Sequence, residues 1–226
     1  MADVMCVGAH PDDVEIGMGA TVAKMVRQGM QVVLVDLTDG EPTPHGTHET
    51  RMKEAAESAQ TLGVAGRHTL DLRNRELADT VEARTMLAEL IRAESPRVLF
   101  APYPVDAHPD HIAASAVVEA ARFYAKFVKT QMTGTPTYPA RIYHYFAVHL
   151  RLLAKPSFIV DVSEDIGRKS EALASYRSQF GEQTSGSVLD WVGAQARVWG
   201  ALIGTEAGEP FFSREEIGIR DIRDLV

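Results

Sequence analysis

Two short and almost wholly apolar runs, joined by a helical stretch, constrain this chain most. They span residues 3–9 (DVMCVGA) and 31–38 (QVVLVDLT), and such runs are typical of strands buried on both faces of a parallel sheet. Between them, residues 17–28 carry apolar side chains at helical spacing, and Gly29 is suited to end that helix. The sequence therefore predicts that the chain begins with a strand–helix–strand unit.

The same alternation continues through residue 125. We expect further elements over residues 49–62 (helix), 68–72 (strand), 80–94 (helix, capped by Thr80), 97–101 (strand) and 109–125 (helix). Strands that alternate with helices favour a doubly wound, mostly parallel sheet of Rossmann-like order, with helices on both faces. This α/β architecture is the predicted fold class.

The last third of the sequence is less regular. Residues 141–146 and 157–162 have the pattern of strands, and we expect them to extend the sheet. Ser163 and Ser187 are suited to open two more helices, the first ending near residue 176 and the second just before Gly204. No linker or internal repeat interrupts the sequence. We therefore expect one domain over residues 1–226.

Composition excludes several classes of protein. Lys and Arg total 23 against 31 for Asp and Glu, so a formal charge of −8 offers no electrostatic footprint for nucleic acid or an anionic membrane. No apolar run approaches the length of a membrane span, and the single cysteine, Cys6, excludes an internal disulfide. We expect a cytoplasmic protein with no membrane or nucleic-acid partner.

Two copies of His-Pro-Asp follow predicted strands. Residues 9–13 (AHPDD) follow the first strand, and residues 107–111 (AHPDH) follow the fourth. In a sheet of this order, the first and fourth strands are neighbours at the switch point, where ligands bind beside the carboxyl ends of the strands. The two segments are therefore expected to face each other across a binding site.

The residue types suit a catalytic zinc site. His10 and Asp13 offer a nitrogen and an oxygen from one turn, and His111 offers a second nitrogen from the other segment. Three protein ligands of this kind leave one position open, as in catalytic rather than structural zinc sites. Asp12 remains as a free base and His108 as a free imidazole. As a structural alternative, His-Pro-Asp at a strand end commonly forms a turn or favours a helix N-terminus.

Residues 9–15 (AHPDDVE) and 108–111 (HPDH) match both signatures of a known family. On these motifs the chain resembles the LmbE-like (PIG-L) zinc-dependent de-N-acetylases over essentially its whole length. Shorter matching segments at residues 176–180 (YRSQF) and 208–211 (GEPF) make it most similar to the bacterial branch that removes acetate from N-acetylglucosaminyl-malate in bacillithiol biosynthesis. The branch pattern is not kept at residues 39–45, so the alternatives are a chitobiose or glucosaminyl-inositol deacetylase.

The resemblance implies a mechanism for hydrolysis of an acetamide on glucosamine. Zn²⁺ would lower the pKa of its water toward about 7, and Fe²⁺ could occupy the same ligands. Asp12 is then the general base. His108 would bind the developing oxyanion and is expected to be protonated, with Asp110 placed to orient it. From another class, a non-catalytic metal-dependent sugar-binding module would need neither Asp12 nor His108.

The resemblance also implies substrate contacts and assembly. Arg51, at the start of the second helix, has a forked donor that suits hydroxyls or a carboxylate. Glu15 belongs to the signature, and Tyr176 and Gln179 lie three residues apart and are placed to reach the cleft or to pack elsewhere. Family resemblance further implies a homo-oligomer, a hexamer or a trimer, that acts on a small sugar.

Overall fold

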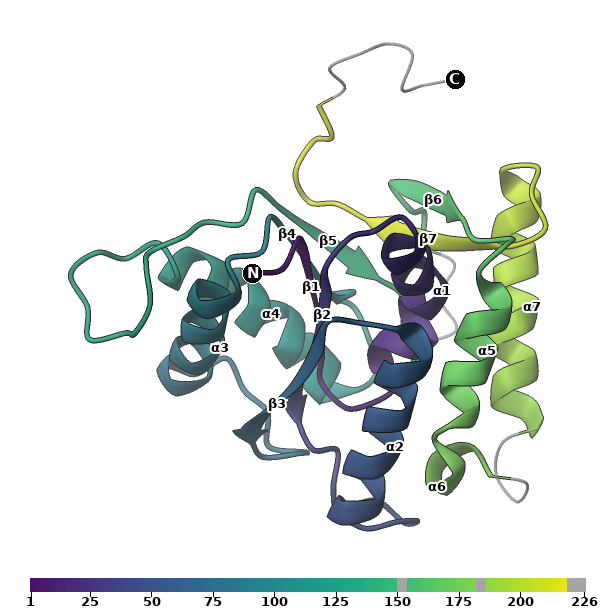
Figure 1. Cartoon of the computed structure of the whole chain (residues 1–226), viewed down its shortest axis with the longest axis horizontal. Helices are drawn as coiled ribbons and strands as arrows, with labels where there is room; N and C mark the ends of the chain where they lie inside the picture. Colours follow the sequence, from purple (N-terminus) through teal and green to yellow (C-terminus); the bar gives the residue numbers. More distant parts are fainter. Residues whose placement is uncertain (150–153, 182–185, 219–226) are drawn as a thin grey trace.

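The computed structural model describes residues 1–149, 154–181 and 186–218 (Figure 1). One sheet of seven strands runs through the middle of the described part, in the order β3-β2-β1-β4-β5-β7-β6. The strands are β1 Val4–Gly8, β2 Val32–Thr38, β3 Gly66–Leu72, β4 Val98–Pro102, β5 Arg141–Tyr145, β6 Phe158–Asp161 and β7 Gly208–Phe212. The first five pair in parallel, and β7 pairs antiparallel with both β5 and β6. The predicted α/β fold, mostly parallel, is confirmed.

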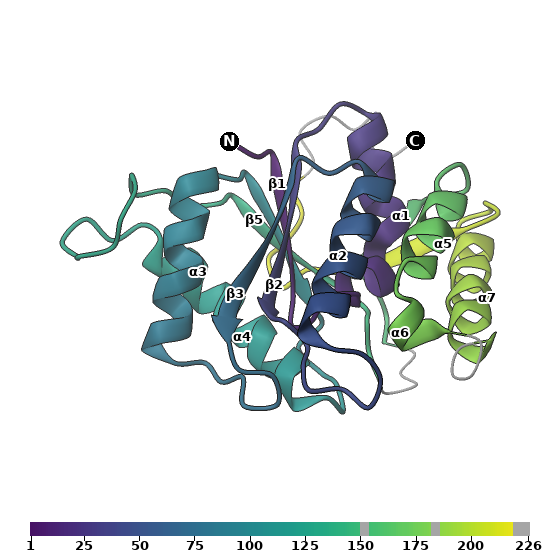
Figure 2. The same ribbon diagram turned by 60° about the horizontal axis from the view of Figure 1, so that its bottom comes forward.

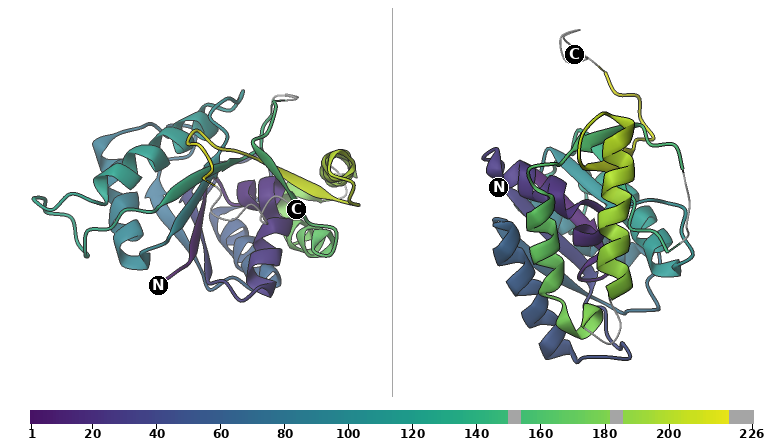
Figure 3. Two further views of the ribbon diagram at one scale, coloured as in Figure 1. Left: turned by 90° about the horizontal axis from the view of Figure 1, so that it is seen from above. Right: turned by 90° about the vertical axis from the view of Figure 1, so that its right-hand side faces the viewer.

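Helices cover both faces of this sheet. They are α1 Asp13–Arg27, α2 His48–Leu62, α3 Val81–Glu94, α4 Pro109–Tyr124, α5 Ile166–Ala174, α6 Arg177–Phe180 and α7 Gly186–Leu202. Helices α3 and α4 lie on one side, α1, α2 and α5 lie on the other, and α7 is the outermost (Figures 2 and 3). Alternate β1 residues serve the two layers, because Met5 and Val7 pack with α3 and α4 while Val4 and Cys6 pack with α1.

The ends of the helices follow the expected chemistry. The side chain of Thr80 accepts a hydrogen bond from the Ala83 amide and caps α3, as predicted. Thr47 caps α2 in the same way, and Gly63 ends α2 with a positive φ of 72° that suits glycine. Of the described helices, none is both long and apolar enough to cross a bilayer.

Two helix boundaries and one strand differ from the sequence prediction. Helix α1 begins at Asp13 rather than at residue 17, because the chain turns into the helix immediately after the first motif. The helix expected over residues 163–176 is shorter, and a break at Ser175 and Tyr176 separates α5 from α6. Residues 208–212 form the unpredicted strand β7, whose apolar run is short and contains Gly and Pro.

Helix α1 consists of two parts. Met18 interrupts the helical geometry with φ −151° and ψ 23°. Beyond it, the amides of Ala20 and Thr21 donate to the buried carboxylate of Glu209 on β7, which Lys169 contacts at 2.7 Å. A carboxylate at this position satisfies amide donors that the interrupted helix leaves free. The last described strand therefore anchors the second part of α1, beyond the interruption at Met18.

Candidate functional site

The turn after β1 places two carboxylates in different directions. Asp12 adopts a left-handed backbone conformation with φ 108°, which is uncommon outside glycine but tolerated by aspartate. Asp13 is the first residue of α1, and its Oδ2 accepts a hydrogen bond from the His10 amide at 2.9 Å. Both carboxyl groups are buried beside the end of the strand. The unusual φ at Asp12 therefore turns its side chain away from that of Asp13.

The segment after β4 forms a different turn. Pro109 is the first residue of α4, and His108 caps the helix because its Nδ1 accepts a hydrogen bond from the Asp110 amide at 3.2 Å. Asp106, two residues upstream, accepts a short hydrogen bond of 2.6 Å from Nδ1 of His111 and others from the amides of residues 107, 108 and 149. This buried carboxylate fixes the orientation of the His111 ring.

The structure brings the two segments together as predicted. His10 Nδ1 lies 3.4 Å from Asp13 Oδ2, and His111 Nε2 lies 3.1 Å from Asp13 Oδ1. One ligand atom from each of these three residues lies within 4.8 Å of the others, so they could hold one metal ion. Among the described residues, a second such set is His10, His108 and Asp110, which shares His10.

The protonation equilibria of this cluster favour a cation. Although burial opposes the shift, contacts with Asp110 and Asp13 raise the pKa of His10 to about 9. Burial also lowers the pKa of His111, but the charges and contacts of Asp13 and Asp106 outweigh this effect and raise it to about 10. Nε2 of His111 is buried and faces Asp13 Oδ1 as an ion pair, without the geometry of a hydrogen bond. The donor set, two imidazoles and one carboxylate, fits a divalent metal that would displace the protons.

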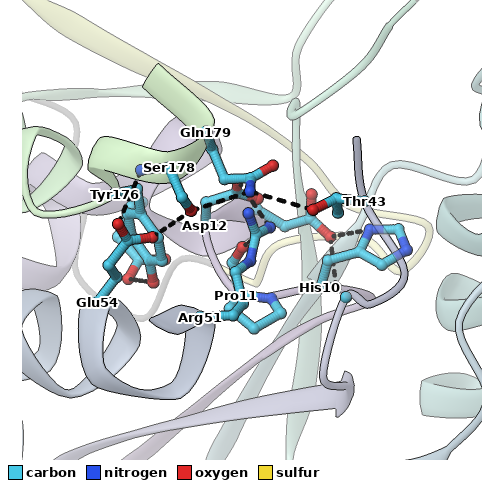
Figure 4. Close-up of polar contacts among 12 residues, drawn as sticks. His10, Pro11, Asp12, Thr43, Arg51, Glu54, Tyr176, Ser178 and Gln179 are labelled. Atoms are coloured by element: carbon cyan, nitrogen blue, oxygen red, sulfur yellow. Dashed lines mark hydrogen bonds and ion pairs between the residues drawn. The ribbon is translucent and has the colours of Figure 1, made fainter. Parts of the chain in front are cut away.

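Asp12 stands apart from this cluster as a buried carboxyl. Burial raises its pKa to about 7, against the opposing charge of Arg51. The Arg51 guanidinium donates from Nη2 to both the Pro11 carbonyl at 2.6 Å and Asp12 Oδ2 at 3.1 Å (Figure 4). A carboxyl with this pKa is suited to exchange a proton near neutral pH.

Two predicted details of the second segment need correction. The carboxylate of Asp110 contacts His10 Nε2 at 3.2 Å, so its partner is the first segment rather than His108. Burial and the nearby charges of His111 and His10 lower the pKa of His108, which argues against the protonated imidazole expected. Because Nδ1 of His108 accepts a hydrogen bond, its neutral ring carries the proton on Nε2 and remains a donor.

A cavity of about 560 Å³ opens over these groups. Arg51 and Gln179, two of the predicted substrate contacts, line it together with the motif residues. Gln179 Nε2 donates to the His45 carbonyl at 2.8 Å and reaches Thr43 at 3.4 Å, so it joins α6 to the loop before α2 (Figure 4). The other residues that line the cavity are Ile16, Gly40, Pro42, Thr43, Asn74, Arg75, residues 147–149, Phe180, Val188 and Trp191.

Glu15 and Tyr176 do not line this cavity, so their expected role as substrate contacts is not supported. Both side chains are fully buried, and the Tyr176 hydroxyl donates to Glu15 Oε1 at 2.8 Å. Arg67 and Ser58 donate to the same oxygen. Tyr176 in turn lies beneath the Arg51 guanidinium, 5.6 Å from ring centroid to Cζ. The two residues support Arg51 from below rather than touch the ligand.

Sequence reasoning missed several residues at the site. Asp106 could have been noticed in the sequence as an acidic residue two positions before the second motif. Its hydrogen bond to His111, however, forms only because the first turn of α4 brings the two side chains together. His149, whose ring centroid lies 5.3 Å from those of both His108 and His111, had none. Trp191 also lines the cavity, and no local sequence pattern places it there.

The chain is similar to several known proteins. A family model described as PIG-L, GlcNAc-PI de-N-acetylase, matches residues 5–122. Over 193 residues the chain is 33% identical to the diacetylchitobiose deacetylase of Thermococcus kodakarensis, covering 79% of this chain and 70% of that protein. It is 31% identical to the 1D-myo-inositol 2-acetamido-2-deoxy-alpha-D-glucopyranoside deacetylase of Nocardiopsis dassonvillei, over 76% of this chain and 69% of the relative.

A solved structure resembles the whole chain. The crystal structure of a conserved protein from Thermus thermophilus superposes with a TM-score of 0.91 at 36% identity. The match covers 98% of this chain and 99% of that one. The two chains therefore share one fold over nearly their full lengths.

Proposed function

Because the chain belongs to the PIG-L family of de-N-acetylases, we propose that it hydrolyses the acetamide of a small N-acetylglucosamine conjugate with the help of a bound metal ion. Water and the amide become acetate and the free amine of glucosamine. The convergence of His10, Asp13 and His111 beside a fourth group, the unliganded carboxyl of Asp12, carries this proposal. A site that only bound metal and sugar would have no use for a buried carboxyl poised near neutral pH.

Zinc is the metal we propose for His10, Asp13 and His111, with Fe²⁺ as the alternative, since nitrogen and oxygen ligands discriminate weakly between them. When bound, zinc supplies Lewis acidity toward the acetyl carbonyl and toward water. The carboxylates behind the two imidazoles support this role. Asp110 contacts His10 and Asp106 contacts His111, so each ring is held in one orientation by a partner that also makes its nitrogen more basic.

Asp12 moves the proton. As the oxygen of water attacks the acetyl carbon, Asp12 accepts a proton from that water, and it returns the proton to the amine nitrogen when the carbon–nitrogen bond breaks. Arg51 holds one oxygen of this carboxyl at 3.1 Å and leaves the other able to react. Burial raises the pKa of Asp12 to about 7, so both directions of transfer are accessible near neutral pH.

His108 is placed to stabilise the carbonyl oxygen as negative charge develops on it. The Asp110 amide fixes Nδ1 as an acceptor, and the proton on Nε2 is therefore available to that oxygen. A preorganised donor of this kind, in a buried site, is typically worth about 10²–10³ in kcat. Arg51 Nε and Nη1 are buried without protein partners, and we propose that they bind an oxygen of the sugar.

The test is release of amine by the zinc-loaded protein from four compounds, with a chelated control. The compounds are diacetylchitobiose, N-acetylglucosaminyl-inositol, N-acetylglucosaminyl-malate and free N-acetylglucosamine. Chelator-sensitive deacetylation of any conjugate supports the proposal, and the preferred conjugate identifies the substrate, including the malate conjugate that the sequence favours. A protein that binds zinc and these sugars without turnover would instead be the binding module.

A further inference from the structure

One wall of the cavity is apolar, and α7 supplies its outer part. Trp191 and Val188 of α7 line the cavity together with Ile16, Val148 and Phe180. The polar groups around the same cavity come from other elements, chiefly Arg51, Asn74 and Arg75. The cavity is therefore amphipathic: a ligand that fills it meets hydrogen-bonding groups on one side and an aromatic, branched-chain surface on the other.

Trp191 lies in the outer part of the cavity. Helix α7 is the outermost helix of its layer, and its first turns lie beside α6 (Figure 3). Trp191 is only half-buried, whereas His10, Asp13 and Arg51 are all buried at the bottom. Because the acetamide must reach the buried metal ligands, the part of a conjugate that meets Trp191 is the group attached to the reacting sugar.

Ile16 connects the reacting end of the cavity to Trp191. Its amide donates to the Asp12 carbonyl at 2.8 Å, so it lies one helical turn from the base. Ile16 and Trp191 also both line a second, small cavity of about 30 Å³. The apolar wall therefore includes a residue close to Asp12 as well as the indole.

The chemistry of this wall selects among the possible conjugates. A sugar or an inositol ring presents carbon–hydrogen bonds on its faces and hydroxyls around its edge, so it can stack on an indole while its edge stays hydrated or hydrogen-bonded. An open-chain dicarboxylate has no such face.

We propose, on the basis of the deacetylase function above, that Trp191 is a stacking platform for a polyhydroxylated ring attached to the reacting N-acetylglucosamine. The substrate class is then a glucosamine linked to a second ring, either another sugar or an inositol, in preference to a malate conjugate. Trp191 acts on binding of the attached ring and takes no part in proton transfer.

Fluorescence of Trp191 provides a test that does not depend on turnover. Trp191 and Trp199 are the two tryptophans of the chain, so Trp199→Phe leaves Trp191 as the single indole. In a zinc-loaded Trp199→Phe/Asp12→Asn variant, we expect diacetylchitobiose and N-acetylglucosaminyl-inositol to change the emission saturably. The malate conjugate and free N-acetylglucosamine should change it little. Equal responses to all four, or none, would overturn the proposal.

Kinetics of Trp191→Leu in the active enzyme give the second test. We expect KM for the ring-bearing substrate to rise about 2- to 12-fold, the range of one aromatic contact, with kcat unchanged. Trp191→Phe should recover most of the loss, and Val198→Ala, on the exposed side of α7, is the matched control. A rise in KM that is the same for free N-acetylglucosamine would contradict the proposal. A saturable emission change without deacetylation of any compound would instead refute the proposed function and leave the platform standing.

Discussion

The two His-Pro-Asp segments have nearly the same sequence and form two different turns. In the first, Asp12 has a left-handed backbone and makes no side-chain cap to α1. In the second, His108 is extended at φ −81° and ψ 116° and caps α4 through its own ring. The first segment offers one imidazole, that of His10, and two carboxylates to the site, whereas the second offers two imidazoles and the carboxylate of Asp110.

The difference shows that the turn, rather than the tripeptide, assigns each residue its role. The two segments also brace one another. Asp110 of the second contacts His10 of the first at 3.2 Å, and Asp13 of the first contacts His111 of the second at 3.1 Å. Neither segment holds its histidine with its own carboxylates alone, so the ligand set exists only when both strands are side by side.

The largest expected effect separates the two aspartates that follow His-Pro. Asp12→Asn keeps the shape and the tolerance for a left-handed backbone but removes the base, so we expect kcat to fall about 10²–10⁴-fold while zinc stays bound. Asp110→Asn, the matched change in the other segment, should weaken the metal instead. Kinetics together with metal content measured on the same samples check this. Loss of metal from Asp12→Asn would place Asp12 among the ligands.

A smaller effect is expected where the carboxylates orient the imidazoles. Asp110→Asn and Asp106→Asn should each weaken zinc binding about 10- to 100-fold, because the rings of His10 and His111 lose the partner that fixes them. Titration against a competing chelator measures the affinity. If Asp110→Asn leaves the affinity intact and changes only kcat, Asp110 acts on His108 as the sequence alone suggested.

The smallest effect concerns the backbone of the two turns. In the metal-free protein, Asp12→Gly should be about 1 kcal/mol more stable than Asp12→Ala, because glycine adopts φ 108° without strain. His108→Ala should lose about 1 kcal/mol with its cap, and His108→Asn should restore it. Urea unfolding measures these differences. Equal stability of the glycine and alanine variants would mean that the turn relaxes when Asp12 is removed.

Most of the fold was predictable because its signals are local. Valine-rich runs predict the buried strands β1 and β2, and Thr80 and Gly29 mark helix ends that the structure confirms. Strand β7 was not predictable, since residues 208–212 form a strand only by pairing with β5 and β6, which are distant in sequence. The break between α5 and α6 was not predicted for a similar reason: Tyr176, at the break, hydrogen-bonds to Glu15, which is distant in sequence.

The candidate site divides in the same way. His10, Asp13 and His111 could be brought together from the sequence, since the order of parallel strands fixes which ends are neighbours. Contacts that depend on the rotamer of a side chain could not be predicted from the sequence. Asp110 lies two residues from His108, and sequence distance alone made that the obvious partner, yet its carboxylate turns to His10. Trp191 enters the cavity because α7 packs on the far edge of the sheet, which no local pattern records.

The capping of α1 by Glu209 has a consequence for how the protein is made. Both segments are synthesised well before β7, which follows them in the sequence. Until then, the amides of Ala20 and Thr21 lack their carboxylate partner, and the second part of α1 lacks its anchor on the sheet. The nascent chain thus carries all of its proposed metal ligands before the contact that anchors α1 can form, and we expect a chain shortened before β7 to keep both motifs and lose that anchor.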